Sequence, residues 1–182
     1  QKGGVKTGLI GKFLNGFPQQ ESDLATAQEG WDDFVVPTSH RAEYRGYDYR
    51  LDDNGTVTAY GHNPTDFLND VLDEKATQFL QTAGDRFFLE LATFTPHLPS
   101  PIAPRNRGTH TGDVAPRDPS YDVAVKNPPK WLAGLPPFTP AVKAHLDRTW
   151  VRRAESAESV ADSVDTVRAE LAATGHPNDT LL

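Results

Sequence analysis

Cysteine and methionine are both absent from the 182 residues of this chain. The lack of cysteine excludes disulfides, thiolate metal sites and cysteine nucleophiles. Long hydrophobic runs are missing as well, since no apolar stretch approaches the roughly 20 residues that span a bilayer. The first residues, Gln1 to Gly4, have no apolar signal-peptide core. We therefore expect no membrane span, and without an initiator methionine Gln1 need not be the biological start.

Positive charge is also scarce, because 18 lysines and arginines stand against 25 aspartates and glutamates, for a net charge of −7. Nonspecific binding to nucleic acid or to anionic membranes needs a basic surface, so the composition argues against both partners. The hydrophobic share of 37% still supports a core. With 15 prolines and 14 glycines, the chain favours an ordered domain with long loops over a helical bundle.

The spacing of apolar residues predicts an α/β fold, with a mostly parallel sheet flanked by helices. The expected elements are strands at 5–10, 47–51, 56–60 and 86–94 and helices at about 65–82 and 140–174. Asp52-Asp53-Asn54-Gly55 lies between the second and third strands and is typical of a hairpin turn. We interpret residues 17–46 as loop-rich. Residues 95–140, which hold eleven of the prolines, are interpreted as a long proline-rich surface excursion.

Two segments place a basic side chain just past the carboxyl end of a predicted strand. Lys12 follows the strand at 5–10, and His97 follows the strand at 86–94. Ligands of open α/β sheets bind at this edge, where a lysine and a histidine together could hold an oxyanion such as sulfate or phosphate. Thr95 and Leu98 each precede a proline, which favours extended backbone on both sides of the imidazole. A histidine held in this way can donate to an anion or protonate a leaving oxygen. The structural alternatives are a solvated lysine and a loop histidine packed among prolines.

Other motifs are weaker. The chain has no P-loop, no dinucleotide fingerprint, no G-x-S-x-G elbow and no H-E-x-x-H spacing. Asp52 and Asp53 lack the spacing of an EF-hand calcium loop, and the hairpin turn already explains them. The remaining histidines have no partner at metal-ligand spacing; they are His40, His62, His110, His145 and His176.

Four segments in order resemble the sulfatase family of the alkaline-phosphatase-like superfamily, and in particular the branch of N-acetylglucosamine-6-sulfatases and related bacterial arylsulfatases. Residues 7–15 resemble "TGLIGKYLN" and residues 60–76 resemble "YG…DYLTDVL…KA". Residues 87–105 are similar to "PFFL…PH.P…PR", and residues 159–180 resemble the stretch before the second metal motif of the family. The resemblance covers essentially the whole chain.

This resemblance implies hydrolysis of a sulfate ester, assisted by calcium and carried out through a formylglycine hydrate. By the same resemblance, Lys12 would contact the sulfate and the catalytic residue, and His97 would hydrogen-bond the sulfate ester. Many sulfatases carry a histidine where this chain has Leu14, and Asn15 would take its place in substrate binding. The implied substrate is a sulfated small molecule or a sulfated glycan.

Two features of the family do not occur in this sequence. The [CS]-x-P-x-R signature in which formylglycine forms is absent. The calcium ligands, an early aspartate pair and a later Asp-Asn pair, would lie upstream of Gln1 and beyond Leu182, and Asp53-Asn54-Gly55 is not the later pair. We therefore expect residues 1–182 to be an incomplete segment of one catalytic domain, with no metal ligands and no turnover alone. Unpaired sheet edges and an uncovered apolar face should then be covered by flanking chain or by a partner.

Two other functions remain open. A trimmed, non-catalytic sulfatase-like module could bind sulfated glycans, or a protein partner through the proline-rich loop. A phosphotransferase of the same superfamily is a third reading.

Overall fold

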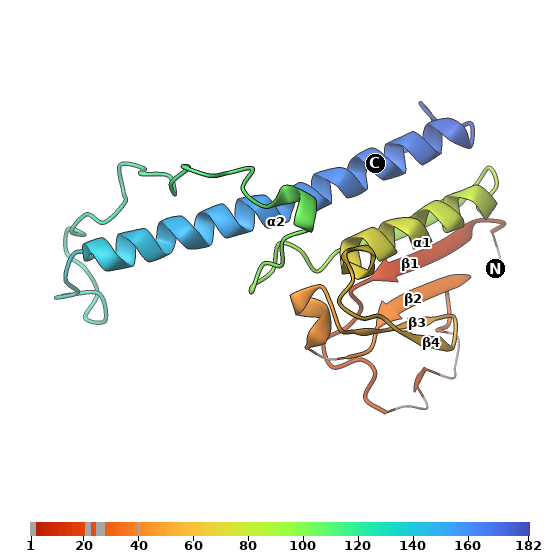
Figure 1. Cartoon of the computed structure of the whole chain (residues 1–182), viewed down its shortest axis with the longest axis horizontal. Coiled ribbons are helices and arrows are strands. Elements are labelled where there is room, and N and C mark those ends of the chain that lie inside the picture. Colours follow the sequence, from red (N-terminus) through yellow and green to blue (C-terminus); the bar gives the residue numbers. More distant parts are fainter. Residues whose placement is uncertain (1–2, 21–22, 25–27, 40) are drawn as a thin grey trace.

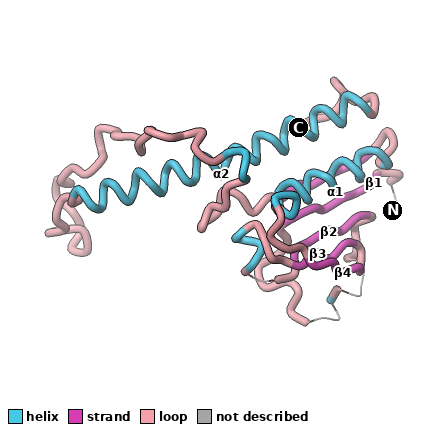
Figure 2. The backbone as a smooth tube through the Cα atoms, viewed as in Figure 1, coloured by secondary structure: helices cyan, strands magenta, loops and turns pink. Residues whose placement is uncertain are grey.

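The computed structural model describes residues 3–20, 23–24, 28–39 and 41–182. Within them the chain forms a five-stranded sheet and two long helices, which confirms the α/β class (Figures 1 and 2). The elements are β1 (Lys6–Gly11), β2 (Asp33–Pro37), β3 (Arg50–Asp53), β4 (Thr56–Ala59), α1 (Leu68–Thr82), β5 (Phe87–Ala92) and α2 (Pro140–Ala173). Short 3-10 turns are η2 (Ala42–Arg45), η3 (Pro64–Asp66) and η4 (Pro104–Asn106).

The strands follow the order β4-β3-β2-β1-β5 across the sheet. β1 pairs in parallel with both β2 and β5, whereas β3 pairs antiparallel with β2 and with β4. Four strands therefore run in one direction and β3 alone is reversed, so the sheet is mostly parallel. The predicted hairpin is β3–β4, where Asn54 has a φ of 52° and the Gly55 N–H donates to Asp52 Oδ1 at 2.8 Å.

The strand β2 lies within residues 17–46, so the interpretation of this stretch as loop-rich is wrong at Asp33–Pro37. Phe34, Val35 and Val36 are each at most 4% exposed, because the sheet is covered on both sides at this strand. A strand buried on both faces is continuously apolar and shows no alternation. Because β2 has only five residues, its apolar run cannot be distinguished in the sequence from a few apolar residues that pack a loop against the core.

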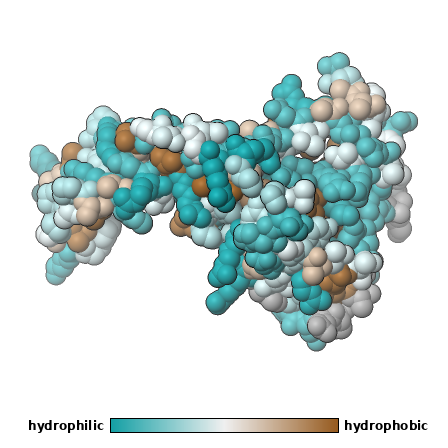
Figure 3. Space-filling view, in the orientation of Figure 1, coloured by the Kyte–Doolittle hydropathy of each residue, from teal (hydrophilic) through white to brown (hydrophobic). Residues whose placement is uncertain are grey.

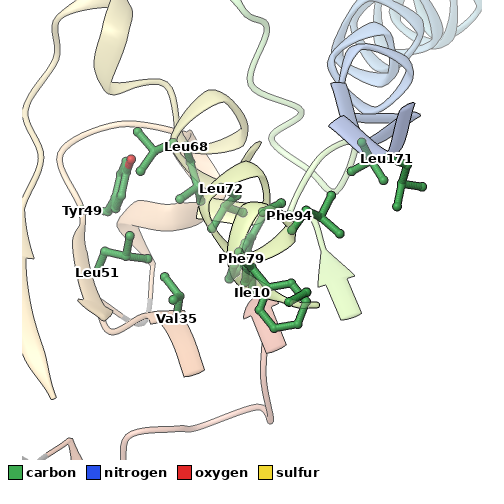
Figure 4. Close-up of a cluster of buried hydrophobic side chains, with 14 residues drawn as sticks. Ile10, Val35, Tyr49, Leu51, Leu68, Leu72, Phe79, Phe94 and Leu171 are labelled. Carbon is green, nitrogen blue, oxygen red and sulfur yellow. The ribbon is translucent and has the colours of Figure 1, made fainter. Parts of the chain in front are cut away.

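One face of the sheet packs against α1 and holds the main core. Figure 4 shows Ile10, Val35 and Leu51 of the strands directed toward Leu72 and Phe79 of the helix. Each such side chain contributes about 1.5–3 kcal/mol on burial. This face confirms the apolar stripe predicted for the helix, although the α-helix proper begins at Leu68.

The opposite face of the sheet is thinly covered. Leu9, Phe34 and Val36 form a second cluster, against which Phe13, Phe17 and Trp31 pack. Phe88 of β5 is 54% exposed, and the outer edge of β5 has no strand partner among the described residues. One edge and part of one face of the sheet are thus left uncovered by the described residues.

α2 has 34 residues and is about 51 Å long. Its C-terminal part lies beside α1, while its N-terminal part projects from the sheet together with the proline-rich excursion (Figure 1). Several apolar side chains stand on this projecting arm, where Figure 3 shows brown patches and Trp131 is 77% exposed. None of the described helices has the length and apolarity that crossing a membrane requires.

The buried face of α2 is more polar than its apolar spacing indicates. Ser156, Ser159 and Ser163 are at most 3% exposed, whereas Val164 is 42% exposed. Val160 and Val164 instead line an open groove of about 330 Å³ beside β5. The small serines let the two helices approach closely, which the apolar periodicity of the sequence does not reveal.

Candidate functional site

Lys12 leaves the sheet next to the end of β5. β1 and β5 end in register, with Gly11 opposite Ala92, and the Lys12 N–H donates to the Ala92 carbonyl at 2.7 Å. Gly11 has a φ of 113°, and a Cβ at this position would collide with the Ala92 carbonyl oxygen. Only glycine combines this backbone conformation with such a close approach. The two carboxyl ends therefore bring Lys12 and the segment leading to His97 to one edge of the sheet.

A neutral amide holds the Lys12 ammonium. Lys12 Nζ donates to Asn15 Oδ1 at 2.6 Å and lies 5.9 Å from the centre of the Phe94 ring. Among the described residues no carboxylate forms an ion pair with Lys12. Glu43 nevertheless lines the same cavity and is 5% exposed. The NH₂ group of Asn15 adds a second donor near the Lys12 ammonium.

His97 lies in a tight turn after β5. Its N–H donates to the Phe94 carbonyl at 2.9 Å, and its own carbonyl accepts from the Ser100 N–H at 2.8 Å. The ring nitrogen Nδ1 lies 2.7 Å from the Leu98 carbonyl oxygen. A carbonyl can only accept, so Nδ1 carries the proton in this arrangement and Nε2 is the nitrogen left for a ligand.

Tyr44 packs against both the His97 ring and the Phe94 ring. Its ring centre lies 4.8 Å from that of His97 and 5.1 Å from that of Phe94, over which Lys12 also lies. A cavity of about 50 Å³ is lined in part by Lys12, Asn15, Tyr44 and Phe94. His97 does not line the cavity, but it packs against Tyr44 in the cavity wall. No pattern in the sequence indicates Tyr44, which belongs to the 3-10 turn η2 within the stretch interpreted as loop-rich.

Two known proteins are similar in sequence to almost the whole of this chain. No family model matches the chain. The chain is 29% identical over 185 residues to human N-acetylglucosamine-6-sulfatase, an alignment that covers 98% of this chain and 33% of the relative. It is 24% identical over 205 residues to an arylsulfatase of Volvox carteri, covering 98% of this chain and 31% of that protein. Both of these similar proteins are sulfatases by name. The chain spans about a third of the length of the curated sulfatases that it matches.

A solved structure shares the fold. It is that of BT4656 in complex with its substrate, D-glucosamine-2-N,6-O-disulfate, and it superposes with a TM-score of 0.63 at 14% identity. The match covers 97% of this chain and 46% of the other. The fold of this chain is therefore one that is found in a solved structure.

Within the described residues no group of three or more histidine, cysteine, aspartate or glutamate side chains could hold a metal ion. The calcium that the sulfatase resemblance implies thus has no ligand set in this part of the chain. Asp53 and Asn54 are engaged otherwise, because Asp53 forms an ion pair with Lys75 at 2.9 Å and Asn54 Nδ2 donates to Asp33 at 3.1 Å.

The weaker histidine candidates lie elsewhere in the structure. Three of them pair with carboxylates: His62 with Asp48, His110 with both Asp113 and Glu158, and His176 with Asp179. His145 is on α2, and His40 lies outside the described residues. None of the four that are described lines the cavity beside Lys12.

Proposed function

We propose that this chain supplies the sulfate-binding side chains of a sulfate-ester hydrolase. Lys12, Asn15 and His97 are the proposed substrate-binding residues, and Lys12 and His97 take part in catalysis. This proposal is carried by contacts at the carboxyl edge of the sheet. Lys12, which donates to Asn15, lies over the Phe94 ring, and His97 packs against Tyr44. The Tyr44 and Phe94 rings contact each other. The named sulfatases that align with 98% of the chain support it.

The arrangement suits a group that carries spread negative charge. The Lys12 ammonium and the Asn15 amide offer N–H donors to sulfate oxygens. Among the described residues no carboxylate forms an ion pair with Lys12, although Glu43 lines the same cavity. Fixed donors aimed at oxygens that gain charge are among the strongest contributions to such transfers. With Nδ1 bound to the Leu98 carbonyl, His97 offers Nε2, which donates to the ester oxygen when the ring is protonated.

We do not assign the nucleophile or the metal ligands of the reaction to residues 1–182. The sequence has no [CS]-x-P-x-R signature, and among the described residues no group of three or more histidine, cysteine, aspartate or glutamate side chains could hold a metal ion. When present, a formylglycine hydrate supplies the nucleophile and calcium stabilises negative charge on the sulfate. We therefore propose that the 182-residue chain binds a sulfated sugar or a related sulfate ester without hydrolysing it. Hydrolysis then requires an added [CS]-x-P-x-R segment and an added Asp-Asn metal segment.

Calorimetric titration of the 182-residue chain with inorganic sulfate and with glucosamine 6-sulfate tests the binding. Lys12→Ala should weaken both affinities by about 10- to 100-fold, because a hydrogen bond to a charged group contributes about 1.5–3 kcal/mol. Lys130→Ala is the matched control, since it removes the same charge from an exposed position in the excursion. Equal affinities for the two variants would refute the site.

A turnover assay separates the hydrolase from a pure binding module. The 182-residue chain should bind without releasing sulfate from an aryl sulfate, whereas a chain extended by both missing segments should release it. Release by the 182-residue chain itself would contradict the assignment of the nucleophile to another segment. Binding without release in the extended chain would favour the non-catalytic module.

A further inference from the structure

Arg152 of α2 contacts the residues that follow His97. Its Nε donates to the Pro99 carbonyl at 2.6 Å and to the Ser100 carbonyl at 3.0 Å. Ser100 is fully buried, has a φ of 55°, and donates through its hydroxyl to the Pro96 carbonyl at 3.0 Å. A positive φ is uncommon outside glycine, so these hydrogen bonds support a backbone conformation that the sequence alone disfavours. One guanidinium thus ties the C-terminal side of the turn to a distant helix.

A buried polar cluster holds the other side of the turn. Asn69 Nδ2 of α1 donates to Thr95 Oγ1 at 2.7 Å and to Ser159 Oγ of α2 at 3.3 Å. The Ser159 hydroxyl donates to the Ser156 carbonyl at 2.8 Å, and its oxygen lies 3.4 Å from Thr95 Oγ1. All three side chains are at most 5% exposed. Hydrogen bonds in so dry a place are strong and costly to break, so the residue two positions before His97 is held as firmly as the residues after it.

We propose that Arg152 and the Asn69–Thr95–Ser159 cluster are positioning residues that hold His97 with its proton on Nδ1. This inference rests on the proposed role of His97 at the sulfate ester. The Leu98 carbonyl that meets Nδ1 at 2.7 Å is joined directly to Pro99, whose own carbonyl accepts from Arg152. Holding the Pro99 carbonyl in place therefore holds the acceptor that selects the tautomer.

The tautomer matters because it decides which nitrogen is left for the substrate. In a free neutral imidazole the proton lies mainly on Nε2, whereas a hydrogen bond from Nδ1 to a carbonyl reverses this preference. Arg152 and the buried cluster do not line the cavity beside Lys12, so they act on the site through His97. Loosening the turn should return the ring of His97 toward the Nε2–H form.

Nitrogen NMR of the histidine rings in the ¹⁵N-labelled 182-residue chain tests this at a pH where the rings are neutral. The wild type should show His97 as the Nδ1–H tautomer, with its signals assigned by their loss in His97→Asn. Arg152→Gln should raise the ratio of Nε2–H to Nδ1–H by about fivefold, the effect of losing one ordinary hydrogen bond. Arg152→Lys keeps a cationic donor and should restore much of the wild-type ratio. Arg153→Gln, the neighbouring exposed arginine, should leave the ratio unchanged.

Ser159→Ala provides a second measurement that does not depend on the folding of the Arg152 variants, and it should shift the ratio in the same direction. An unchanged tautomer ratio in folded Arg152→Gln, or a wild-type His97 in the Nε2–H form, would overturn the inference. Sulfate titration of the same samples separates the two proposals. If the tautomer follows Arg152 but sulfate does not bind, the proposed function fails and the positioning role of Arg152 stands.

Discussion

Asp73 provides a sharp test of the packing between the two helices. It lies on α1 against the serine-lined face of α2, is 7% exposed, and leaves Oδ1 without a hydrogen-bond partner in the structure described. Burial raises the pKa of Asp73 to about 6 from the ordinary 3.8, opposed by a hydrogen bond with Ser163. The neighbouring Asp70 adds to the rise and Arg105 lessens it. The folded protein thus favours the neutral carboxyl.

The sign and size of the effect on stability follow from this difference. Because the folded state holds the proton more tightly than the unfolded chain, the Asp73 contribution is most favourable at acidic pH and is lost as the pH rises through about 4 to 6. The full loss is about 3 kcal/mol, of which about 2 kcal/mol falls between about pH 4.5 and 7.5. Asp73→Asn keeps the shape of the side chain and removes its ionisation. The variant should therefore lack this part of the pH dependence.

Urea unfolding followed by tryptophan fluorescence measures the effect at both pH values. The free energy of unfolding of the wild type should fall by about 2 kcal/mol more than that of Asp73→Asn between about pH 4.5 and 7.5. Asp165→Asn, an exposed position on α2, should behave like the wild type. If the wild type and Asp73→Asn lose stability in parallel, the carboxyl is not buried as the structure describes.

Two further changes test the site edge and the excursion. Gly11→Ala should lower the free energy of unfolding in urea by about 2 kcal/mol or more, because it adds a clash with the Ala92 carbonyl to the cost of a positive φ. Gly16 also has a positive φ but has open space around it, so Gly16→Ala should lower the free energy of unfolding by less. Equal losses in the two variants would exclude the clash. Hydrogen bonding to Asp113 raises the pKa of His110, so its contribution to stability is present below its unfolded pKa and is lost as the pH rises through the folded one. His110→Asn should flatten that decline in pH-dependent unfolding, and an unaltered decline would show that the pairing does not persist in solution.

Much of the secondary structure could be predicted because local patterns are sufficient for it. The hairpin follows from Asn54-Gly55, whose preference for positive φ is a property of these residues alone. The helix over residues 68–82 follows from apolar residues at helical spacing. β2 could not be predicted in this way, because its identity as a strand depends on pairing with β1 and β3 and not on any pattern within its five residues.

Some residues of the candidate site could likewise be predicted from the sequence, and others could not. Lys12 and His97 could be selected from the sequence because each follows an apolar strand, and parallel strands place their carboxyl ends at one edge. Tyr44 could not be selected, since it reaches the site from a 3-10 turn after β2. Arg152 and Asn69 were equally hidden, because their contacts with the His97 turn join segments that are far apart in the chain.

By itself the sequence determined the α/β class, the strand ends that carry Lys12 and His97, and the resemblance to sulfatases, since short-range spacing and segment order carry these. Only the tertiary structure decided which ring nitrogen of His97 is left for a ligand and which side chains connect it to Lys12. Those outcomes depend on hydrogen bonds and ring contacts between residues from four separate segments. Such contacts form only when the chain has packed, because bringing distant segments together costs conformational entropy. Burial of the core offsets that cost, and no local preference of the sequence does so.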